Sequence, residues 1–336
     1  MAKGQKGRQE IEEVCKGPLA SKIDLFLTDM ARNGFGGTVL IAEGDDVVLN
    51  KGFGFSREGI RCTASTIFDI GSITKQFTAT AILRLEEEGL VSVNDSISKY
   101  FDHVPEDKAR ITIHHLLTHT AGLLHSYGED YEIAFRDETL KKMFEQPLKF
   151  QPGTAYSYSN GGYSVLAALI ERVTGRSFEE YLRSTFFDPL GMRYTGYSLP
   201  EQLKVPVVMD KSRKDGPYWY LYGNGGLLST TGDLFRWHLA LHGGEVLSEL
   251  QKKRLFIPYV KTDEGTSFYG YGWFIDMTSR GTTLISHSGE SGEGINSDFL
   301  YYKDEDILMI IFSDVRLNGK IAVDVIEELL EGIIFG

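Results

Sequence analysis

The strongest chemical signal in the sequence is a serine followed three residues later by a lysine, at Ser72 and Lys75. A strand-like segment, 66–71, precedes the pair, and an apolar helical pattern follows it. Residues three apart share one face of a helix, with Cβ atoms roughly 5–6 Å apart, so the lysine can contact the serine hydroxyl. The positive end of the helix dipole also favours negative charge that develops there. The pair predicts a serine nucleophile, although Ser72 is also a good helix N-cap, and the spacing alone leaves both roles open.

A second pair, Tyr158 and Asn160, follows a Pro-Gly turn and precedes another helical pattern. Residues two apart in an extended segment or loop point the same way, so a phenol and a carboxamide can enter one cleft. A neighbouring ammonium group would lower the pKa of the phenol, and Tyr158 could then exchange a proton with Ser72 or with a leaving group. Asn160 can hydrogen-bond Lys75 and a substrate amide. A structural role is the alternative for both residues.

A third candidate lies where an alternating apolar segment, 282–286, predicts a strand that ends in His287, Ser288 and Gly289. A small residue at a strand edge lets a substrate carbonyl approach the backbone. An N–H group there could complete an oxyanion hole with the N–H of Ser72. His287 would supply a donor or a switchable charge facing the cleft. A lone histidine is usually structural, so a chemical role is supported only by the other two motifs.

Each motif has a second match in the chain that we interpret as structural. Ser96 and Lys99 repeat the serine–lysine spacing within a short polar segment, where a surface or capping serine is expected. Tyr222 and Asn224 repeat the tyrosine–asparagine spacing but run directly into the glycines of a turn. The two glycines after His242 predict a helix end capped by glycine.

Three motifs in this order, each in the local structure that its chemistry requires, make the chain similar to a known superfamily. It resembles the serine β-lactamases and penicillin-binding proteins, in particular their class C-like branch of esterases, D-amino-acid peptidases and related hydrolases. The resemblance covers residues 20 to about 315 and extends beyond the three motifs to the segments 115–123, 189–192, 225–230 and 269–273.

The resemblance implies that Ser72 is the acylated nucleophile and Lys75 its activating base or proton relay. Tyr158 would be the general base and acid around acylation and deacylation, and Asn160 would position the substrate and the lysine. His287 stands where many relatives carry the lysine of a Lys-Thr-Gly strand. A histidine holds a substrate carboxylate only when it is protonated, which argues against an efficient β-lactamase.

The same resemblance implies substrate binding at Ser288 and Gly289 and an oxyanion hole formed by the backbone N–H groups of Ser72 and Glu290. Relatives usually have a small residue at the position of Glu290, and a carboxylate near the cleft would disfavour anionic substrates. We therefore expect a serine hydrolase that forms an acyl-enzyme on Ser72 and cleaves a carboxylic ester or a peptide-like or D-amino-acid amide. The alternatives are a class C-type β-lactamase, a penicillin-binding-like protein that only binds or is slowly acylated, and a catalytically silent binding protein.

Composition is consistent with one soluble enzyme that acts on a small acyl substrate. The chain has 336 residues, 42% of them hydrophobic, and a net charge of −12 from 35 basic and 47 acidic residues. This balance argues against nucleic acid or an anionic membrane as a partner. No apolar run approaches the roughly 20 residues of a membrane span. Residues 1–8 are basic but lack the apolar core of a signal peptide, so we expect a cytoplasmic protein unless a leader has been removed.

No metal or other cofactor is expected, and the sequence leaves the oligomeric state open. His115 and His119 have the spacing of a metal pair on a helix, but no glutamate follows His115, so packing is the preferred interpretation. The two cysteines, Cys15 and Cys62, are expected to be free thiols. Four aromatic residues are candidates either for an acyl pocket or for loop packing: Tyr127, Tyr131, Trp219 and Tyr222.

The order of the periodic segments predicts an α+β fold: an antiparallel sheet built from both chain ends, flanked by terminal helices, with a large helical insertion. The resemblance implies the β-lactamase/transpeptidase-like version of this fold. We expect one catalytic domain, 1–336, with an α/β lobe at about 20–70 and 251–336, a helical lobe at about 71–250, and the site at their seam. The expected elements are a helix at 23–30, strands at 37–42, 47–52, 270–275, 282–286, 297–302 and 307–312, a closing helix at 320–330, and loops at 101–111, 123–135 and 195–225.

Overall fold

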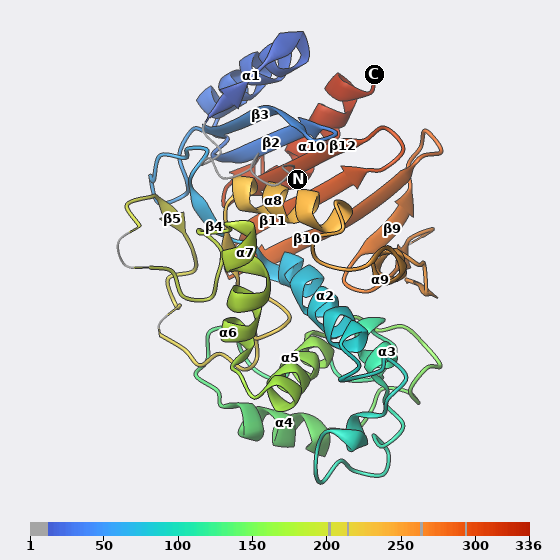
Figure 1. The fold of residues 1–336 in the computed structure, drawn as a ribbon. Coiled ribbons are helices and arrows are strands. Elements are labelled where there is room, and N and C mark those ends of the chain that lie inside the picture. The colour runs from blue at the N-terminus through green and yellow to red at the C-terminus, as the bar shows by residue number, and fades with distance from the viewer. Residues whose placement is uncertain (1–12, 201–202, 214, 263–264, 293) are drawn as a thin grey trace.

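The computed structural model describes residues 13–200, 203–213, 215–262, 265–292 and 294–336. Within them, a nine-stranded sheet runs in the order β1-β3-β2-β12-β11-β10-β9-β8-β7, and each neighbouring pair is antiparallel (Figure 1). The two ends of the chain meet where β2 pairs with β12. The predicted α+β fold is therefore confirmed. The strands are β1 (Val14–Cys15), β2 (Gly37–Glu43), β3 (Asp46–Phe53), β7 (Val260–Lys261), β8 (Phe268–Tyr269), β9 (Phe274–Met277), β10 (Thr283–Ser291), β11 (Ile295–Tyr302) and β12 (Ile307–Ser313).

The sheet is covered on both faces, and the alternation of side chains along β12 shows why. Ile307, Met309 and Ile311 join one hydrophobic core, whereas the residues between them join the other core. Successive side chains of a strand point to opposite faces, so a strand that is buried on both faces reads as one continuous apolar run. The helices α1 (Gly17–Arg32) and α10 (Ala322–Ile334) pack over the first face, as predicted for the terminal helices (Figure 1).

The opposite face carries α8 (Thr231–His242), which contacts β2 and β12, and beyond it the helices between β3 and β7. In this part α2 (Thr74–Glu87) packs on α5 (Asn160–Thr174) and extends away from the sheet (Figure 1). The predicted division into two lobes stays a prediction, and α8, which it assigns to the helical lobe, packs on the sheet. The remaining elements are η1 (Gly71–Ile73), η2 (Ile97–Lys99), α3 (Ile113–Leu117), α4 (Arg136–Glu145), α6 (Phe178–Leu182), η3 (Arg183–Phe187), α7 (Asp188–Leu190), α9 (Glu249–Leu255), a β13–β14 hairpin (Arg316–Leu317 and Lys320–Ile321), and a small sheet of β4 (Ile67–Asp69), β5 (Val207–Val208) and β6 (Leu228–Ser229).

Two strand predictions need correction. The segment 270–275 was expected to be one strand, but β9 begins only at Phe274, because a turn occupies the residues before it. Gly272 in this turn has φ +79°, and a Cβ atom there would lie 2.7 Å from the carbonyl oxygen of Lys75. The turn therefore packs against α2. The strand that was expected to end near Gly289 continues to Ser291.

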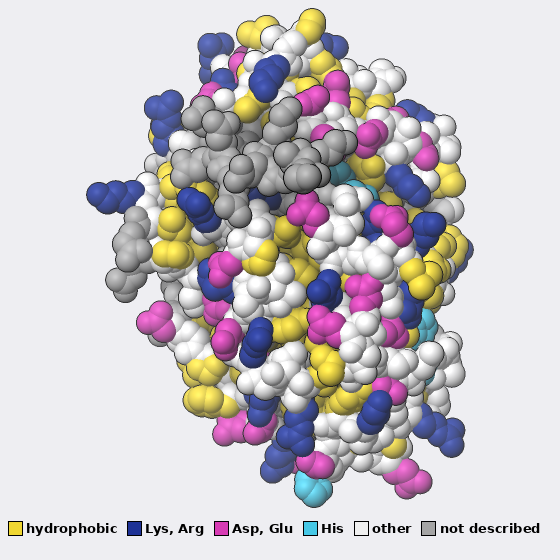
Figure 2. All heavy atoms as spheres, in the orientation of Figure 1, with side chains coloured by type: hydrophobic (Ala, Val, Ile, Leu, Met, Phe, Trp, Pro, Cys, Tyr) yellow, Lys and Arg dark blue, Asp and Glu magenta, His cyan; other side chains and the backbone are white. Residues whose placement is uncertain are grey.

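Several smaller expectations can be placed on the structure. Cys15 is exposed, Cys62 is buried, and both are free thiols, as predicted. The basic segment 1–8 lies outside the described residues. In the described part of the chain, no helix combines the length and the apolar character needed to cross a bilayer. Figure 2 shows basic and acidic side chains interspersed over one face of the molecule.

Two carboxyl groups lie close together on β11 and α10: Asp298 is buried and Glu327 is half-buried. Asp298 on β11 is 5% exposed, and its Oδ2 has no hydrogen-bond partner among the described residues. Burial, together with the nearby Asp324, raises the pKa of Asp298 to about 7. Burial, together with Asp298 and other neighbouring carboxylates, raises the pKa of Glu327 to about 8. Both groups therefore bind protons more tightly in the folded protein than in the unfolded chain.

This arrangement predicts a pH-dependent stability. A raised carboxyl pKa contributes stability that is fully present below the unfolded value near pH 4 and is lost as pH rises through 7 to 8. We expect Asp298→Asn to reduce the fall in unfolding free energy between pH 5 and pH 8 by about 1 kcal/mol or more. Urea unfolding at pH 5 and pH 8 measures this change in unfolding free energy. Glu328→Gln, at an exposed position of α10, is the control. An unchanged pH dependence in Asp298→Asn would contradict this assignment.

Candidate active site

Ser72 lies in the 3₁₀ turn η1, immediately before α2, and Lys75 lies in the first turn of α2. Lys75 Nζ is 2.9 Å from Ser72 Oγ, so the structure brings the predicted pair together. Ser72 is half-buried, whereas Lys75 is fully buried. The N-cap positions of η1 and α2 are occupied by Ile70 and Ile73, and neither makes a side-chain cap hydrogen bond. Ser72 therefore does not serve as the N-cap of either helix.

Lys75 Nζ contacts two further oxygen atoms, Asn160 Oδ1 at 2.9 Å and the backbone oxygen of Asn224 at 2.7 Å. Both are amide oxygens, which can only accept hydrogen bonds. A neutral amine has two N–H donors and one lone pair. If the two N–H groups point at the two amide oxygens, the lone pair is left facing the Ser72 hydroxyl. The geometry therefore fits a lysine that accepts the serine proton.

The electrostatic surroundings of Lys75 favour the same protonation state. Burial lowers its pKa well below the ordinary value, and Asp130 acts in the opposite direction. Among the described residues, no carboxylate lies within ion-pair distance of Nζ, and its hydrogen-bond partners are all uncharged. A buried ammonium without a counter-ion loses its hydration and gains little in return. Lys75 is thus suited to be a base at neutral pH.

Asn224 is a site residue that the sequence interpretation missed. It belongs to the Tyr222–Asn224 match that was assigned to a turn, and the turn is indeed present. Its backbone oxygen holds Lys75, and its side chain donates to Ser164 Oγ at 2.8 Å. A Cβ atom at Gly223 would lie 2.4 Å from the carbonyl oxygen of Tyr163, so only glycine allows this close approach. The run of glycines was the available signal that a backbone atom approaches the site here.

Tyr158 lies beside Lys75, with its ring centroid 4.8 Å from Nζ. The predicted lowering of its phenol pKa is wrong: burial raises this pKa, and an interaction with Ser72 offsets only part of the effect. The expectation failed because it assumed a charged lysine and ignored desolvation. Tyr158 therefore keeps its proton at neutral pH and can donate it. His119 packs against this ring, with centroids 4.2 Å apart.

His287 is placed differently from the expectation of a switchable charge facing the cleft. It is 1% exposed, and its ring nitrogens contact the Tyr269 hydroxyl at 3.1 Å and the Ser288 oxygen at 2.6 Å. Burial, with a smaller contribution from Lys75, lowers its pKa to about 3. His287 is therefore neutral at physiological pH and cannot hold a substrate carboxylate by charge.

The backbone of β10 approaches the nucleophile closely. Gly71 has φ +49°, and a Cβ atom there would lie 2.6 Å from the Glu290 nitrogen. A Cβ atom at Gly289 would lie 2.0 Å from the Ile70 oxygen. In the described residues, β9 pairs with β10 only as far as Ser286, so the segment 287–291 has no strand partner on that side. The predicted oxyanion hole at Ser72 and Glu290 is thus brought together, and its function stays a prediction.

The other residues that the sequence analysis singled out can also be located in the structure. Ser288 is exposed and stands opposite Asp298 on β11, so strand alternation turns its side chain to the face away from His287 and Gly289. Substrate binding at Ser288 and Gly289 stays a prediction. Ser96 accepts a hydrogen bond from Ser98 as the N-cap of η2, as predicted. The helix α8 ends at His242, with Gly243 as its C-cap.

The histidines at 115 and 119 each make a local hydrogen bond through Nδ1. His115 Nδ1 accepts a hydrogen bond from the backbone of Thr112, and His119 Nδ1 accepts one from the backbone of Ser159 at 3.1 Å. Within the part of the chain that the structure describes, no group of three potential metal ligands comes together. The two histidines thus stabilise local structure, and His119 also supports the ring of Tyr158.

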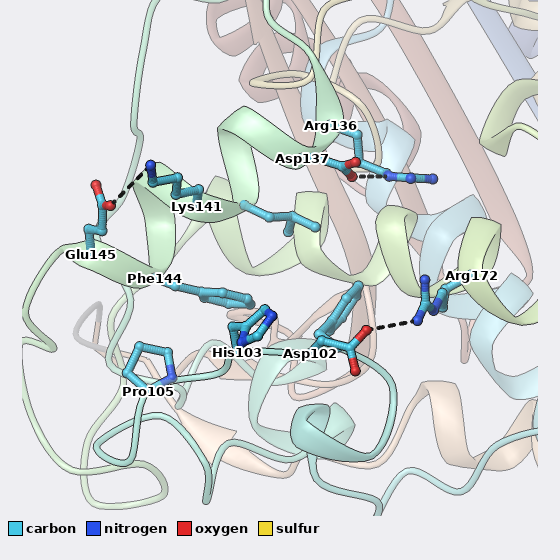
Figure 3. A pocket seen from close by; sticks show the side chains of 11 residues that line it. Asp102, His103, Pro105, Arg136, Asp137, Lys141, Phe144, Glu145 and Arg172 are labelled. Atoms are coloured by element: carbon cyan, nitrogen blue, oxygen red, sulfur yellow. Dashed lines mark hydrogen bonds and ion pairs between the residues drawn. The ribbon is translucent and has the colours of Figure 1, made fainter.

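A pocket of about 640 Å³ lies elsewhere, between α4 and the loop at 101–105 (Figure 3). Its lining includes the apolar side chains of Phe101, Leu140 and Phe144, and its charged side chains are paired, as in Arg172 with Asp102 and Lys141 with Glu145. None of its lining residues belongs to the group around Ser72. The reactive groups therefore lie in a different region from this pocket, and we assign it no chemistry.

Comparison with known proteins is consistent with this geometry. The family model described as "Beta-lactamase" matches residues 23–327. The putative penicillin-binding protein PbpX of Bacillus subtilis (strain 168) is 32% identical, over 94% of this chain and 78% of that protein. The teichoic acid D-alanine hydrolase of Staphylococcus aureus is 26% identical, over 92% of this chain and 77% of that protein. The octameric penicillin-binding protein homologue from Pyrococcus abyssi superimposes with a TM-score of 0.79 at 28% identity, covering 94% of this chain and 77% of that one.

The neutral lysine predicts that two substitutions that keep a long side chain, one charged and one uncharged, have the same effect. Lys75→Arg retains a cation but cannot accept a proton, because the guanidinium stays charged at any working pH. We expect the acylation rate constant with p-nitrophenyl acetate to fall by about a hundredfold or more, as for the uncharged Lys75→Met. Stopped-flow measurement of the p-nitrophenol burst determines it, with thermal unfolding as the check on folding. An arginine variant that keeps most of the rate would show that charge, not basicity, is needed.

Proposed function

The chain belongs to the β-lactamase family, and from this premise we propose that it is a serine hydrolase that forms an acyl-enzyme on Ser72. The observation that carries the proposal is the 2.9 Å contact between Ser72 Oγ and Lys75 Nζ, with the lysine held by two amide oxygens. A catalytically silent binding protein would have no use for this arrangement. No cofactor is required for the chemistry described below.

In the acylation step, neutral Lys75 takes the proton of Ser72 as Oγ attacks the substrate carbonyl carbon. The carbonyl oxygen becomes an oxyanion, for which the backbone N–H groups of Ser72 and Glu290 are the proposed donors. The bond to the leaving group then breaks, and the leaving group takes a proton from Tyr158. The ammonium of Lys75 then gives its proton to the Tyr158 phenolate, which restores the neutral lysine and the phenol. Water repeats the sequence on the acyl-enzyme and releases the acid.

Asn160 and Asn224 act in this scheme by keeping Lys75 unprotonated and correctly oriented. Their oxygen atoms accept the two N–H groups of the neutral amine, at 2.9 and 2.7 Å. A carboxylate in place of either oxygen would stabilise the ammonium and raise the lysine pKa. The neutral amide oxygens therefore help to keep the pKa of Lys75 low, and they also hold its side chain in position.

The charges around the site favour a substrate with a free ammonium group. Asp130 is half-buried and interacts electrostatically with Lys75, and it makes no hydrogen bond or ion pair among the described residues. Burial, followed by Asp69 and Glu129, raises its pKa. A cationic group would relieve this unfavourable environment, whereas the carboxylate of a penicillin would add to it. Neutral His287 offers such a carboxylate no charge in return.

We therefore propose that the substrate is an ester or amide of an amino acid whose amino group is free. A relative at 26% identity that is named as a D-alanine hydrolase supports a D-aminoacyl group, since D-alanine carries such an ammonium. The relative named as a putative penicillin-binding protein keeps slow acylation by penicillin as the second candidate. The class C-type β-lactamase alternative is disfavoured by the lack of charge on His287.

The acyl-enzyme proposal predicts a covalent adduct on one serine. Intact-protein mass spectrometry after mixing with a fluorescent phosphonate should show one adduct in the wild type and none in Ser72→Ala. Hydrolysis of D-alanine p-nitroanilide should fall by about a thousandfold or more in the same variant. Ser96→Ala, which removes the other serine of the same spacing, is the matched control and should behave as the wild type. Labelling that persists in Ser72→Ala would refute the assignment.

The substrate proposal predicts a charge-selective effect at Asp130. In Asp130→Asn, kcat/KM for D-alanine p-nitroanilide should fall about tenfold, which corresponds to about 1.4 kcal/mol. The N-acetylated substrate, which has no ammonium, should be hydrolysed at nearly the wild-type rate. Glu129→Gln, an exposed neighbour, serves as the control. Equal losses with both substrates would show that Asp130 does not recognise the ammonium group.

A further inference from the structure

The hydroxyl of Tyr131 joins two segments that lie on opposite sides of the candidate oxyanion hole. Tyr131 is half-buried in the loop between α3 and α4. Its hydroxyl donates to Asp69 Oδ2 and lies 2.7 Å from Ser291 Oγ. Asp69 ends β4, and Ser291 ends β10, so residues far apart in the sequence are linked through one phenol.

The first of these links leads to the nucleophile. Asp69 Oδ1 accepts a hydrogen bond from the backbone nitrogen of Gly71 at 3.0 Å, and Gly71 immediately precedes Ser72. The carboxylate of Asp69 is fully buried and is paired with Arg213 at 3.2 Å. Arg213 is fixed in turn by the backbone oxygen of Gly226 at 2.8 Å. Asp69 is therefore a rigid, charge-balanced support for the turn that carries Ser72.

The second contact, between Tyr131 and Ser291, leads to the other side of the candidate oxyanion hole. Ser291 is 4% exposed and directly follows Glu290, whose backbone N–H is the second proposed donor. Pairing with β9 stops at Ser286, so the end of β10 is held by β11 and by contacts such as the one with Tyr131. A side-chain hydrogen bond at Ser291 can therefore influence where the Glu290 nitrogen lies.

The direction of the hydrogen bonds in this bridge follows from the groups involved. Burial, followed by the charge of Asp69, raises the pKa of the Tyr131 phenol, so it stays protonated. Its single proton goes to the carboxylate, which can only accept. The hydroxyl of Ser291 must then donate to the phenol oxygen. Each group in the chain from Ser291 through Tyr131 to Asp69 thus has one defined orientation.

We propose that Tyr131 is a positioning residue that sets the separation of the two oxyanion-hole donors, the N–H groups of Ser72 and Glu290. This inference rests on the proposed function. Tyr131 does not need to touch the substrate, because it acts through the backbone on either side. Oxyanion donors act within a narrow range of distance, and a misplacement of about 1 Å can cost about a hundredfold in rate.

The test is Tyr131→Phe, which keeps the ring and removes only the hydroxyl. We expect the acylation rate constant with p-nitrophenyl acetate to fall tenfold to a hundredfold while KM changes less than about twofold. Inhibition by phenylboronic acid, which forms a tetrahedral adduct on the serine, should weaken by a similar factor. Tyr127→Phe is the matched control: it removes another phenol of the same loop, bonded to the backbone of Leu124 at 3.0 Å, and should leave both values unchanged.

Ser291→Ala cuts the same bridge at its other end and provides a second variant if Tyr131→Phe does not fold. In this variant too, the acylation rate constant should fall while KM stays nearly unchanged. The double variant should be no slower than Tyr131→Phe alone. Wild-type rate and boronate inhibition in either variant, or equal losses in Tyr127→Phe, would overturn the positioning role. A wild-type protein that forms no adduct on Ser72 would instead overturn the proposed function itself.

Discussion

The burial of Lys75 without a counter-ion is the physical constraint on which the rest of the site depends. A lysine in water is an ammonium ion at neutral pH, and an ammonium ion cannot accept a proton from serine. Desolvation reverses this preference, but only where every partner of Nζ is uncharged. The chain meets this condition with the serine that is to be activated, one side-chain amide and one backbone carbonyl. The same desolvation keeps Tyr158 protonated and His287 neutral.

Close backbone contacts at glycines assemble this environment. The glycines at 71 and 289 bring β10 against the turn that carries Ser72, and the glycine at 272 brings the β8–β9 connection against α2. The glycine at 223 brings the turn with Asn224 against α5. A Cβ atom at any of these positions would clash with a backbone atom of the neighbouring element, so the elements would have to move apart. These glycines therefore allow four parts of the structure to meet at one place: the sheet, α2, α5 and the 222–226 turn.

Much of the fold could be predicted from the sequence because its signals are local. The hairpin of β2 and β3, the strands β11 and β12 and the two terminal helices follow from periodicity and turn residues. The Ser72–Lys75 contact also follows from helical spacing. The role of the Asn224 backbone oxygen could not be predicted, because the neighbouring glycines indicate a close backbone approach but not which main-chain atom holds Lys75. Residue types likewise do not show whether desolvation or a neighbouring charge will decide a pKa, and the expectation for Tyr158 failed for this reason.

The most direct test of the central claim is neutron diffraction from a deuterium-exchanged crystal at pH 7, which locates the protons at Lys75 and Ser72. The account predicts two deuterons on Nζ, directed at Asn160 Oδ1 and the Asn224 oxygen, and a deuteron on Ser72 Oγ that points at the nitrogen. Three deuterons on Nζ, with one directed at Ser72 Oγ, would mean that the resting lysine is an ammonium ion. In that case another group would have to accept the serine proton, and the role given to the two amide oxygens would be wrong.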